Sequence, residues 1–164
     1  YYNALGENEQ ALLLARALQI FMPGKPQVWY LDLFAGSNDY EAVKRAGAGG
    51  HKEINRTNFT QKDIQSGLEK EVVKKQLEML KFRKEFPAFG FDAEMEIRTK
   101  PAAQISAQAE NALHFAELPA DQMYNRIYIT WKKDGYLARL SADLKAHTYR
   151  IQALDPSGNL IWQM

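Results

Sequence analysis

The sequence predicts an α/β part over residues 1–88, followed by a small antiparallel β-domain over residues 89–164. Before Pro87, apolar residues recur at helical spacing on either side of one short aromatic and β-branched run, whereas after it they alternate with polar residues. The composition is that of a packed fold, because 46% of the 164 residues are hydrophobic and 25% are charged.

The α/β part is expected to contain an apolar helix, one buried strand and a long amphipathic helix. Asn8 is a candidate N-cap for the first helix, over residues 9–22. The run at 27–31 is short, aromatic and β-branched, which predicts a buried strand. The long helix is expected over residues 69–86, where Pro87 ends it.

The stretch between that strand and the long helix shows weaker signals. A short helix is expected over residues 39–46, with Asn38 and Glu41 at capping-box spacing. Residues 47–58 lack periodicity, and an irregular stretch of this length inside a compact domain is usually functional or disordered. A further helical turn is expected over 60–67.

The β-domain is predicted from alternation and turns. Asp134–Gly135 is a hairpin signal, and a second turn is expected over residues 156–159. This pattern predicts an antiparallel meander with one wet face. Residues 99–122 are rich in Ala and Gln and are expected to hold a weak strand and a loop. The alternating apolar residues are Ala93, Met95, Ile97, Ile127, Ile129, Trp131, Tyr136, Ala138, Leu140, Tyr149, Ile151 and Ala153.

The predicted strand at 27–31 has no partner within residues 1–88. A fully buried strand needs a neighbour on each side to satisfy its backbone groups. The sequence therefore predicts that further strands precede this chain and that the chain is a C-terminal fragment. The alternatives are that the strand pairs with the β-domain or with a second copy in a homodimer.

Charge and composition exclude several classes of protein. The net charge of +1 provides no basic field for nucleic acid, and no apolar run reaches the roughly 18 residues that span a bilayer. Cysteine is absent, which excludes disulfides and fits a cytoplasmic protein. His51, His114 and His147 lack metal-ligand spacing, and the glycines of 47–50 do not form a P-loop. No metal or cofactor is expected.

Five segments carry a resemblance to one family. They include Pro-Gly-Lys-Pro-Gln-Val-Trp-Tyr at 23–30, Leu-Phe-Ala-Gly-Ser-Asn-Asp at 33–39 and His-Lys-Glu-Ile-Asn-Arg at 51–56. Residues 2–6 and the segment from Val72 through the long helix to Phe89 complete the set, and all five segments occur in the order that the family has. Together they resemble the sucrose-phosphorylase-like enzymes of the α-amylase superfamily (glycoside hydrolase family 13), over about residues 1–90.

This resemblance implies the last part of a (β/α)₈ barrel, with 27–31 as its eighth strand, followed by a small antiparallel β-domain. It also implies a retaining glycosyltransferase-type phosphorylase that moves glucose from an α-glucoside to inorganic phosphate and forms α-glucose 1-phosphate. The two carboxylates that such enzymes need lie earlier in the family's chain. No catalytic residue is therefore expected here, and the fragment alone is expected to be inactive.

Three residues are candidates for binding the sugar substrate or inorganic phosphate. Asp32 follows the predicted strand end, where barrel sites are built. Lys52 falls where the family has an Arg, and His51 precedes it. Lysine keeps the charge but loses the bidentate fork, which favours relatives acting on sucrose 6′-phosphate, glucosylglycerol or glucosylglycerate over sucrose.

Each candidate also has a plainer interpretation. Asp32 could cap its loop, His51 could simply be exposed, and Trp29 and Tyr30 are expected to pack in the barrel rather than to bind sugar. For the β-domain, the alternative is a carbohydrate-binding or interaction module without catalysis.

Overall fold

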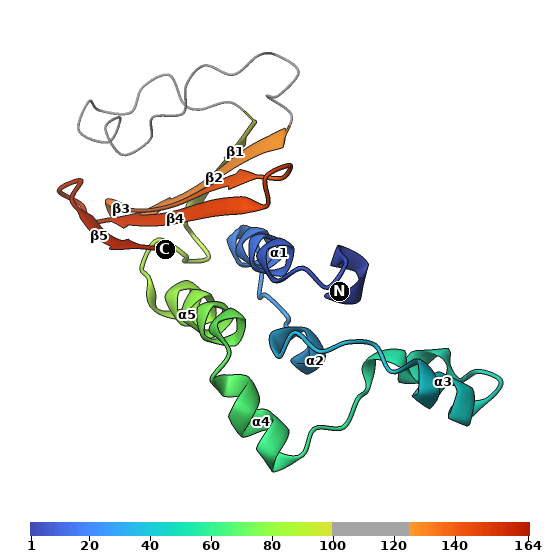
Figure 1. The fold of residues 1–164 in the computed structure, drawn as a ribbon. Coiled ribbons are helices and arrows are strands. Elements are labelled where there is room, and N and C mark those ends of the chain that lie inside the picture. Colours follow the sequence, from blue (N-terminus) through green and yellow to red (C-terminus); the bar gives the residue numbers. More distant parts are fainter. Residues whose placement is uncertain (100–124) are drawn as a thin grey trace. The chain divides into compact units, whose positions relative to one another are not determined.

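The computed structural model describes residues 1–99 and 125–164, which form two units, Tyr1–Lys84 and Glu85–Met164. The first unit consists of helices and loops, and the second contains a sheet (Figure 1). The helical elements are η1 (Asn3–Leu5), α1 (Glu9–Phe21), α2 (Tyr30–Leu33), α3 (Tyr40–Ala46), η2 (Gly50–Asn55), α4 (Gln61–Leu68) and α5 (Glu71–Glu85). The strands are β1 (Glu94–Arg98), β2 (Arg126–Lys133), β3 (Tyr136–Asp143), β4 (Thr148–Leu154) and β5 (Leu160–Gln163).

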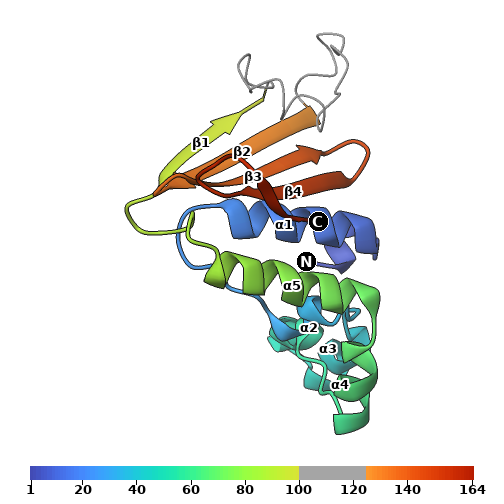
Figure 2. The ribbon, with the colours of Figure 1, turned by 90° about the vertical axis from the view of Figure 1, so that its left-hand side faces the viewer.

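The two long predicted helices are confirmed. α1 begins after Asn8, whose side chain accepts a hydrogen bond from the Ala11 amide at 3.0 Å, as the cap signal predicts. α1 and α5 run alongside each other (Figure 2). Their buried residues are mostly apolar, with one arginine and one glutamine among them: Ala11, Leu12, Leu13, Leu14, Arg16, Ala17, Ile20, Phe21, Val72, Val73, Gln76, Met79 and Phe82.

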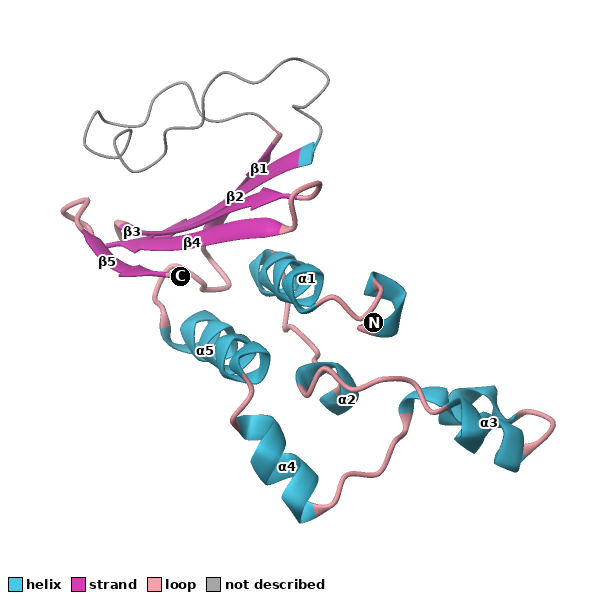
Figure 3. Cartoon of the chain, viewed as in Figure 1, coloured by secondary structure: helices cyan, strands magenta, loops and turns pink. Residues whose placement is uncertain are grey.

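The predicted strand at 27–31 is not a strand in this structure. Residues 25–29 form a loop, and Tyr30–Leu33 is the one-turn helix α2 (Figure 3). Trp29 keeps an extended backbone, with φ −77° and ψ 138°. Within the described residues no strand lies beside this segment, and a strand without neighbours cannot satisfy its backbone groups. The α/β character expected for residues 1–88 is therefore not present in the described chain.

The middle of the first unit is more regular than the sequence predicts. The helices expected over 39–46 and 60–67 appear as α3 and α4. Asp39 caps α3, since its carboxylate accepts from the Ala42 amide at 2.8 Å, whereas Asn38 was the expected cap. Residues 47–58 were expected to be irregular, but η2 occupies half of them. A 3₁₀-helix is too short to produce a periodic pattern in sequence.

The second unit is an antiparallel sheet in the order β1-β2-β3-β4-β5, which confirms the predicted meander. Ile129, Leu140 and Ile151 lie opposite one another across β2, β3 and β4 and are almost completely buried. Phe89 packs on Trp131 with ring centroids 5.8 Å apart, at one end of this apolar face. The weak strand expected within 99–122 lies almost entirely outside the described residues.

The prediction of one wet sheet face is wrong in part. The second face carries polar side chains, but Tyr128, Ser141 and Gln152 on it are buried. Alternation therefore predicts the polarity of a face but not the exposure of each residue on it. Among the described helices, none combines the length and apolar character needed to cross a bilayer. Within residues 1–99 and 125–164, no group of three acidic or histidine side chains is placed to hold a metal ion.

Asp143 makes the stability of the β3–β4 turn depend on pH. Its carboxylate accepts from the amides of Lys145 (3.0 Å) and Ala146 (2.9 Å) and from Nε of Arg126 at 3.3 Å. These contacts, led by the Ala146 amide, lower the pKa of Asp143. Its contribution to stability is then present above the unfolded pKa of about 3.9 and is lost as the pH falls through the lowered folded value.

We expect Asp143→Asn to flatten the loss of stability below about pH 4, since the amide does not titrate there. Urea unfolding of the wild type and the variant between pH 2 and pH 7 measures this. Equal slopes in the acid range would show that Asp143 does not contribute.

Candidate functional site

Asp32 lies on α2 and is held from two sides. Its carboxylate accepts from the Tyr2 amide at 3.0 Å, and its side chain is only 16% exposed. The carbonyl of Leu33 accepts from Nε2 of Gln76 at 2.9 Å, and the carbonyl of Asp32 is 3.4 Å from the same nitrogen. Asp32 is thus part of the packing of its turn, and its predicted role as a pocket residue stays a prediction.

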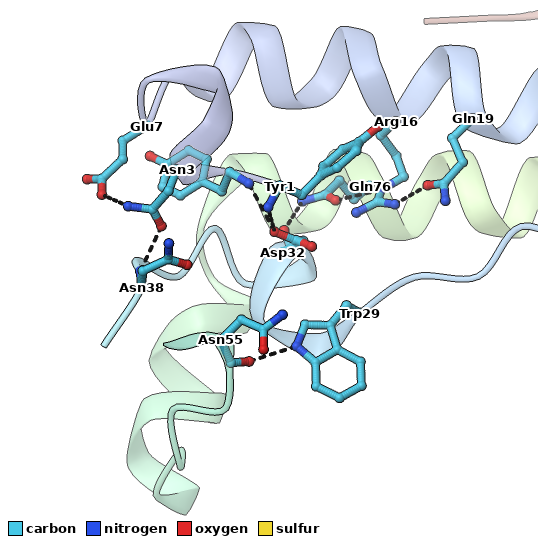
Figure 4. Close-up of polar contacts among 11 residues, drawn as sticks. Tyr1, Asn3, Glu7, Arg16, Gln19, Trp29, Asp32, Asn38, Asn55 and Gln76 are labelled. Atoms are coloured by element: carbon cyan, nitrogen blue, oxygen red, sulfur yellow. Dashed lines mark hydrogen bonds and ion pairs between the residues drawn. The ribbon is translucent and has the colours of Figure 1, made fainter. Parts of the chain in front are cut away.

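Gln76 belongs to a buried polar cluster between α1, α2 and α5 (Figure 4). Its Oε1 accepts from Nε of Arg16 at 2.9 Å, and Arg16 is only 2% exposed. Arg16 also donates to Gln19, and its guanidinium carbon lies 5.7 Å from the centre of the Tyr1 ring. Burial lowers the pKa of Arg16. Within the described residues, the hydrogen bonds of Arg16 go to the neutral amides of Gln76 and Gln19, and this buried charge therefore depends on them.

Sequence reasoning missed this cluster. The signal was available, since Arg16 interrupts the apolar run of α1 and Gln76 stands among the buried residues of α5. A buried polar side chain within an apolar stripe usually has a specific partner.

His51 and Lys52 lie together on η2, and both are exposed. Gly50 precedes them and is buried so close to α3 that a Cβ there would collide with Ala46. Gly49 has φ +83°, a conformation that favours glycine. The glycines therefore set the path by which the chain reaches His51 and Lys52.

The end of η2 is attached to the segment around α2 by two aromatic side chains. Nε1 of Trp29 donates to the carbonyl of Asn55 at 2.8 Å, and the hydroxyl of Tyr30 donates to the carbonyl of Thr57 at 2.9 Å. The Asp39 amide also donates to the carbonyl of Ile54 at 2.8 Å. Trp29 and Tyr30 were expected to pack in a barrel, whereas here their polar atoms fix a loop.

The structure brings His51 and Lys52 together but does not join them to Asp32. Among the described residues, no hydrogen bond or ion pair links Asp32 to either of them. A hollow of about 340 Å³ lies elsewhere in this unit and contains none of the three. It is lined by Phe34, Gly36, Thr57, Asn58, Phe59, Asp63, Ser66, Gly67 and Lys70.

Comparison with known proteins identifies close relatives. The chain is 47% identical over 143 residues to a sucrose 6(F)-phosphate phosphorylase of Ilumatobacter coccineus, and 37% identical over 158 residues to that of Thermoanaerobacterium thermosaccharolyticum. It is 32% identical over 131 residues to a glucosylglycerol phosphorylase of Marinobacter adhaerens. The chain spans about a quarter of each relative's length, 27% for the first two and 26% for the third.

A solved structure matches as well. The crystal structure of sucrose 6F-phosphate phosphorylase from Thermoanaerobacter thermosaccharolyticum aligns with all of this chain and with 28% of its own, at a TM-score of 0.76 and 35% identity. No family model matches the sequence.

Proposed function

We propose that this chain, which is related in sequence and fold to the C-terminal part of the sucrose-phosphorylase-like enzymes, contributes part of the substrate site of a retaining glucosyl phosphorylase. The observation that carries the proposal is the 47% identity over 143 residues to a sucrose 6(F)-phosphate phosphorylase. The enzyme would transfer glucose from an α-glucoside to inorganic phosphate and release α-glucose 1-phosphate. The carboxylates that form and break the glycosidic bond would come from outside this chain.

In this proposal residues 27–31 form the eighth strand of the barrel once neighbouring strands are present. The extended backbone of Trp29 supports this, and Asp32 would then lie just after the C-terminal end of that strand. The chain alone would lack both the nucleophile and the acid and would be inactive.

Lys52 would bind an anion, either inorganic phosphate or the phosphate of a phosphorylated sugar. Its ammonium group is exposed and makes no ion pair with another described residue, so its charge is available to a ligand. An ammonium group is a compact point charge with three donors, which suits a single phosphate oxygen. His51 beside it and Asp32 would complete the contacts to phosphate and sugar.

A hybrid enzyme tests the proposed reaction. The matching C-terminal part of the Thermoanaerobacterium thermosaccharolyticum enzyme would be replaced by this chain, and α-glucose 1-phosphate would be measured with sucrose 6F-phosphate, sucrose and glucosylglycerol as donors. We expect phosphorolysis of at least one donor by the hybrid and none by this chain alone. A folded hybrid that forms no α-glucose 1-phosphate from any donor would contradict the proposal.

In that hybrid we expect Lys52→Ala to raise KM for phosphate, or for the phosphorylated donor, by about tenfold, the equivalent of one charge-assisted contact. Lys52→Arg should retain most of the affinity because it keeps the charge. Lys75→Ala, at an exposed position of α5, is the matched control and should leave KM unchanged. An unaltered KM in Lys52→Ala would remove Lys52 from the site.

A further inference from the structure

We infer that Trp29 and Tyr30 are positioning residues that hold η2, and with it Lys52, in place by donating hydrogen bonds to the backbone just beyond Lys52. This inference rests on the proposed function in one respect, namely that Lys52 contacts phosphate. It gives Trp29 and Tyr30 an indirect role in ligand affinity, exerted through the position of Lys52, rather than a role in packing or in direct contact with the sugar.

The two donors act on neighbouring carbonyls from one short segment. Nε1 of Trp29 reaches the carbonyl of Asn55, the last residue of η2, at 2.8 Å. The hydroxyl of Tyr30 reaches the carbonyl of Thr57 at 2.9 Å. Carbonyls at a helix end have no partner within the helix, so side-chain donors are an effective means of fixing them.

The donors are themselves fixed in place. The rings of Trp29 and Tyr30 are 5.0 Å apart, and Phe59 meets Tyr30 edge-on with ring centroids 5.6 Å apart. Trp29 is 43% exposed, so its indole buries less apolar surface than a core residue does. Its hydrogen bond to Asn55 is therefore a larger share of what it contributes to this contact. Two rigid donors with few rotatable bonds therefore determine where the backbone after Lys52 lies.

η2 needs such external attachment. A 3₁₀-helix has poor internal hydrogen-bond geometry and is stable only in short pieces. Most side chains of η2, including His51 and Lys52, are exposed or half-buried and provide little packing. Among the described residues, η2 is also held by the packing of Gly50 against Ala46 of α3, by the Asp39 amide donating to the carbonyl of Ile54, and by the local pair Glu53–Arg56 at 3.2 Å. Loss of an aromatic donor should therefore let the backbone of η2, and with it Lys52, sample a wider range of positions.

Tyr30→Phe tests the inference, because it removes only the hydroxyl and keeps the ring packing. In the hybrid enzyme we expect KM for phosphate, or for the phosphorylated donor, to rise about fivefold while kcat changes less than about twofold, the equivalent of one neutral hydrogen bond. Trp29→Phe should act in the same direction. The control is Tyr40→Phe, at an exposed tyrosine on α3.

A double-mutant cycle separates positioning from general stability. If Tyr30 acts through Lys52, Tyr30→Phe should have no further effect on KM in the Lys52→Ala background. Additive effects would overturn the inference, as would an unchanged KM in Tyr30→Phe when Lys52→Ala raises it. If Lys52→Ala itself changes nothing, the proposed role of Lys52 fails, and the inference fails with it for that separate reason.

Discussion

Replacing Gln76 with leucine is expected to destabilise the chain by about 3 kcal/mol, because it removes a hydrogen bond to a buried guanidinium and a donor to a backbone carbonyl. Leucine occupies a similar volume on α5 but removes both bonds of the amide. Nε of Arg16 loses its acceptor at 2.9 Å, and the carbonyl of Leu33 loses its donor. Arg16 keeps its contact with Gln19, but a lost hydrogen bond to a charged group costs more than one between neutral groups.

The double variant Arg16→Met/Gln76→Leu should recover part of that stability, since replacing both partners of a buried hydrogen bond by apolar groups of similar volume can be nearly neutral. Gln65→Leu, at an exposed position of α4, is the control and should shift stability by less than about 0.5 kcal/mol. Urea unfolding of the wild type, Gln76→Leu, the double variant and the control measures these changes. Equal destabilisation by the single and the double variant would show that Arg16 does not depend on Gln76.

Leu140→Ala is expected to cost the β-domain about 3 kcal/mol. Leu140 lies at the centre of β3, is completely buried and stands between Ile129 and Ile151 in register. Truncation removes apolar contact and leaves a cavity that paired strands on both sides cannot close.

Ile161→Ala on β5 provides the comparison, because Ile161 is 52% exposed and should lose much less. Urea unfolding followed by tryptophan fluorescence reports on the sheet through Trp131 and Trp162, with Trp29 of the first unit adding to the signal. A loss below about 1 kcal/mol for Leu140→Ala would contradict the assigned core.

Local signals were enough to predict most elements. Asn8 and the pair Thr60 and Asp63 mark helix starts through contacts that span only three residues, and the structure contains both. Alternation predicted the strands around Trp131 and Leu140, because side chains of a strand change face at every residue. The resemblance to the sucrose-phosphorylase-like enzymes was also predicted correctly, since the motifs that carry it are runs of adjacent residues.

The errors have a different cause. The segment around Val28 has strand composition, yet strand formation depends on neighbours that local sequence does not describe. The bonds from Trp29 to Asn55 and from Gln76 to Leu33 join residues 26 and 43 positions apart, so no spacing rule could predict them. The sequence therefore predicted which residues belong to the candidate site, whereas the hydrogen bonds that hold those residues in place could only be seen in the structure.

Amide hydrogen exchange at Val28 and Trp29 tests most directly the central claim that this chain supplies the last strand of a barrel. In the chain alone we expect rapid exchange, since no strand of the described residues pairs with this segment. In the hybrid enzyme we expect exchange at least about 100-fold slower, because a barrel strand is hydrogen-bonded on both sides. Equal exchange rates in the two proteins would contradict the account.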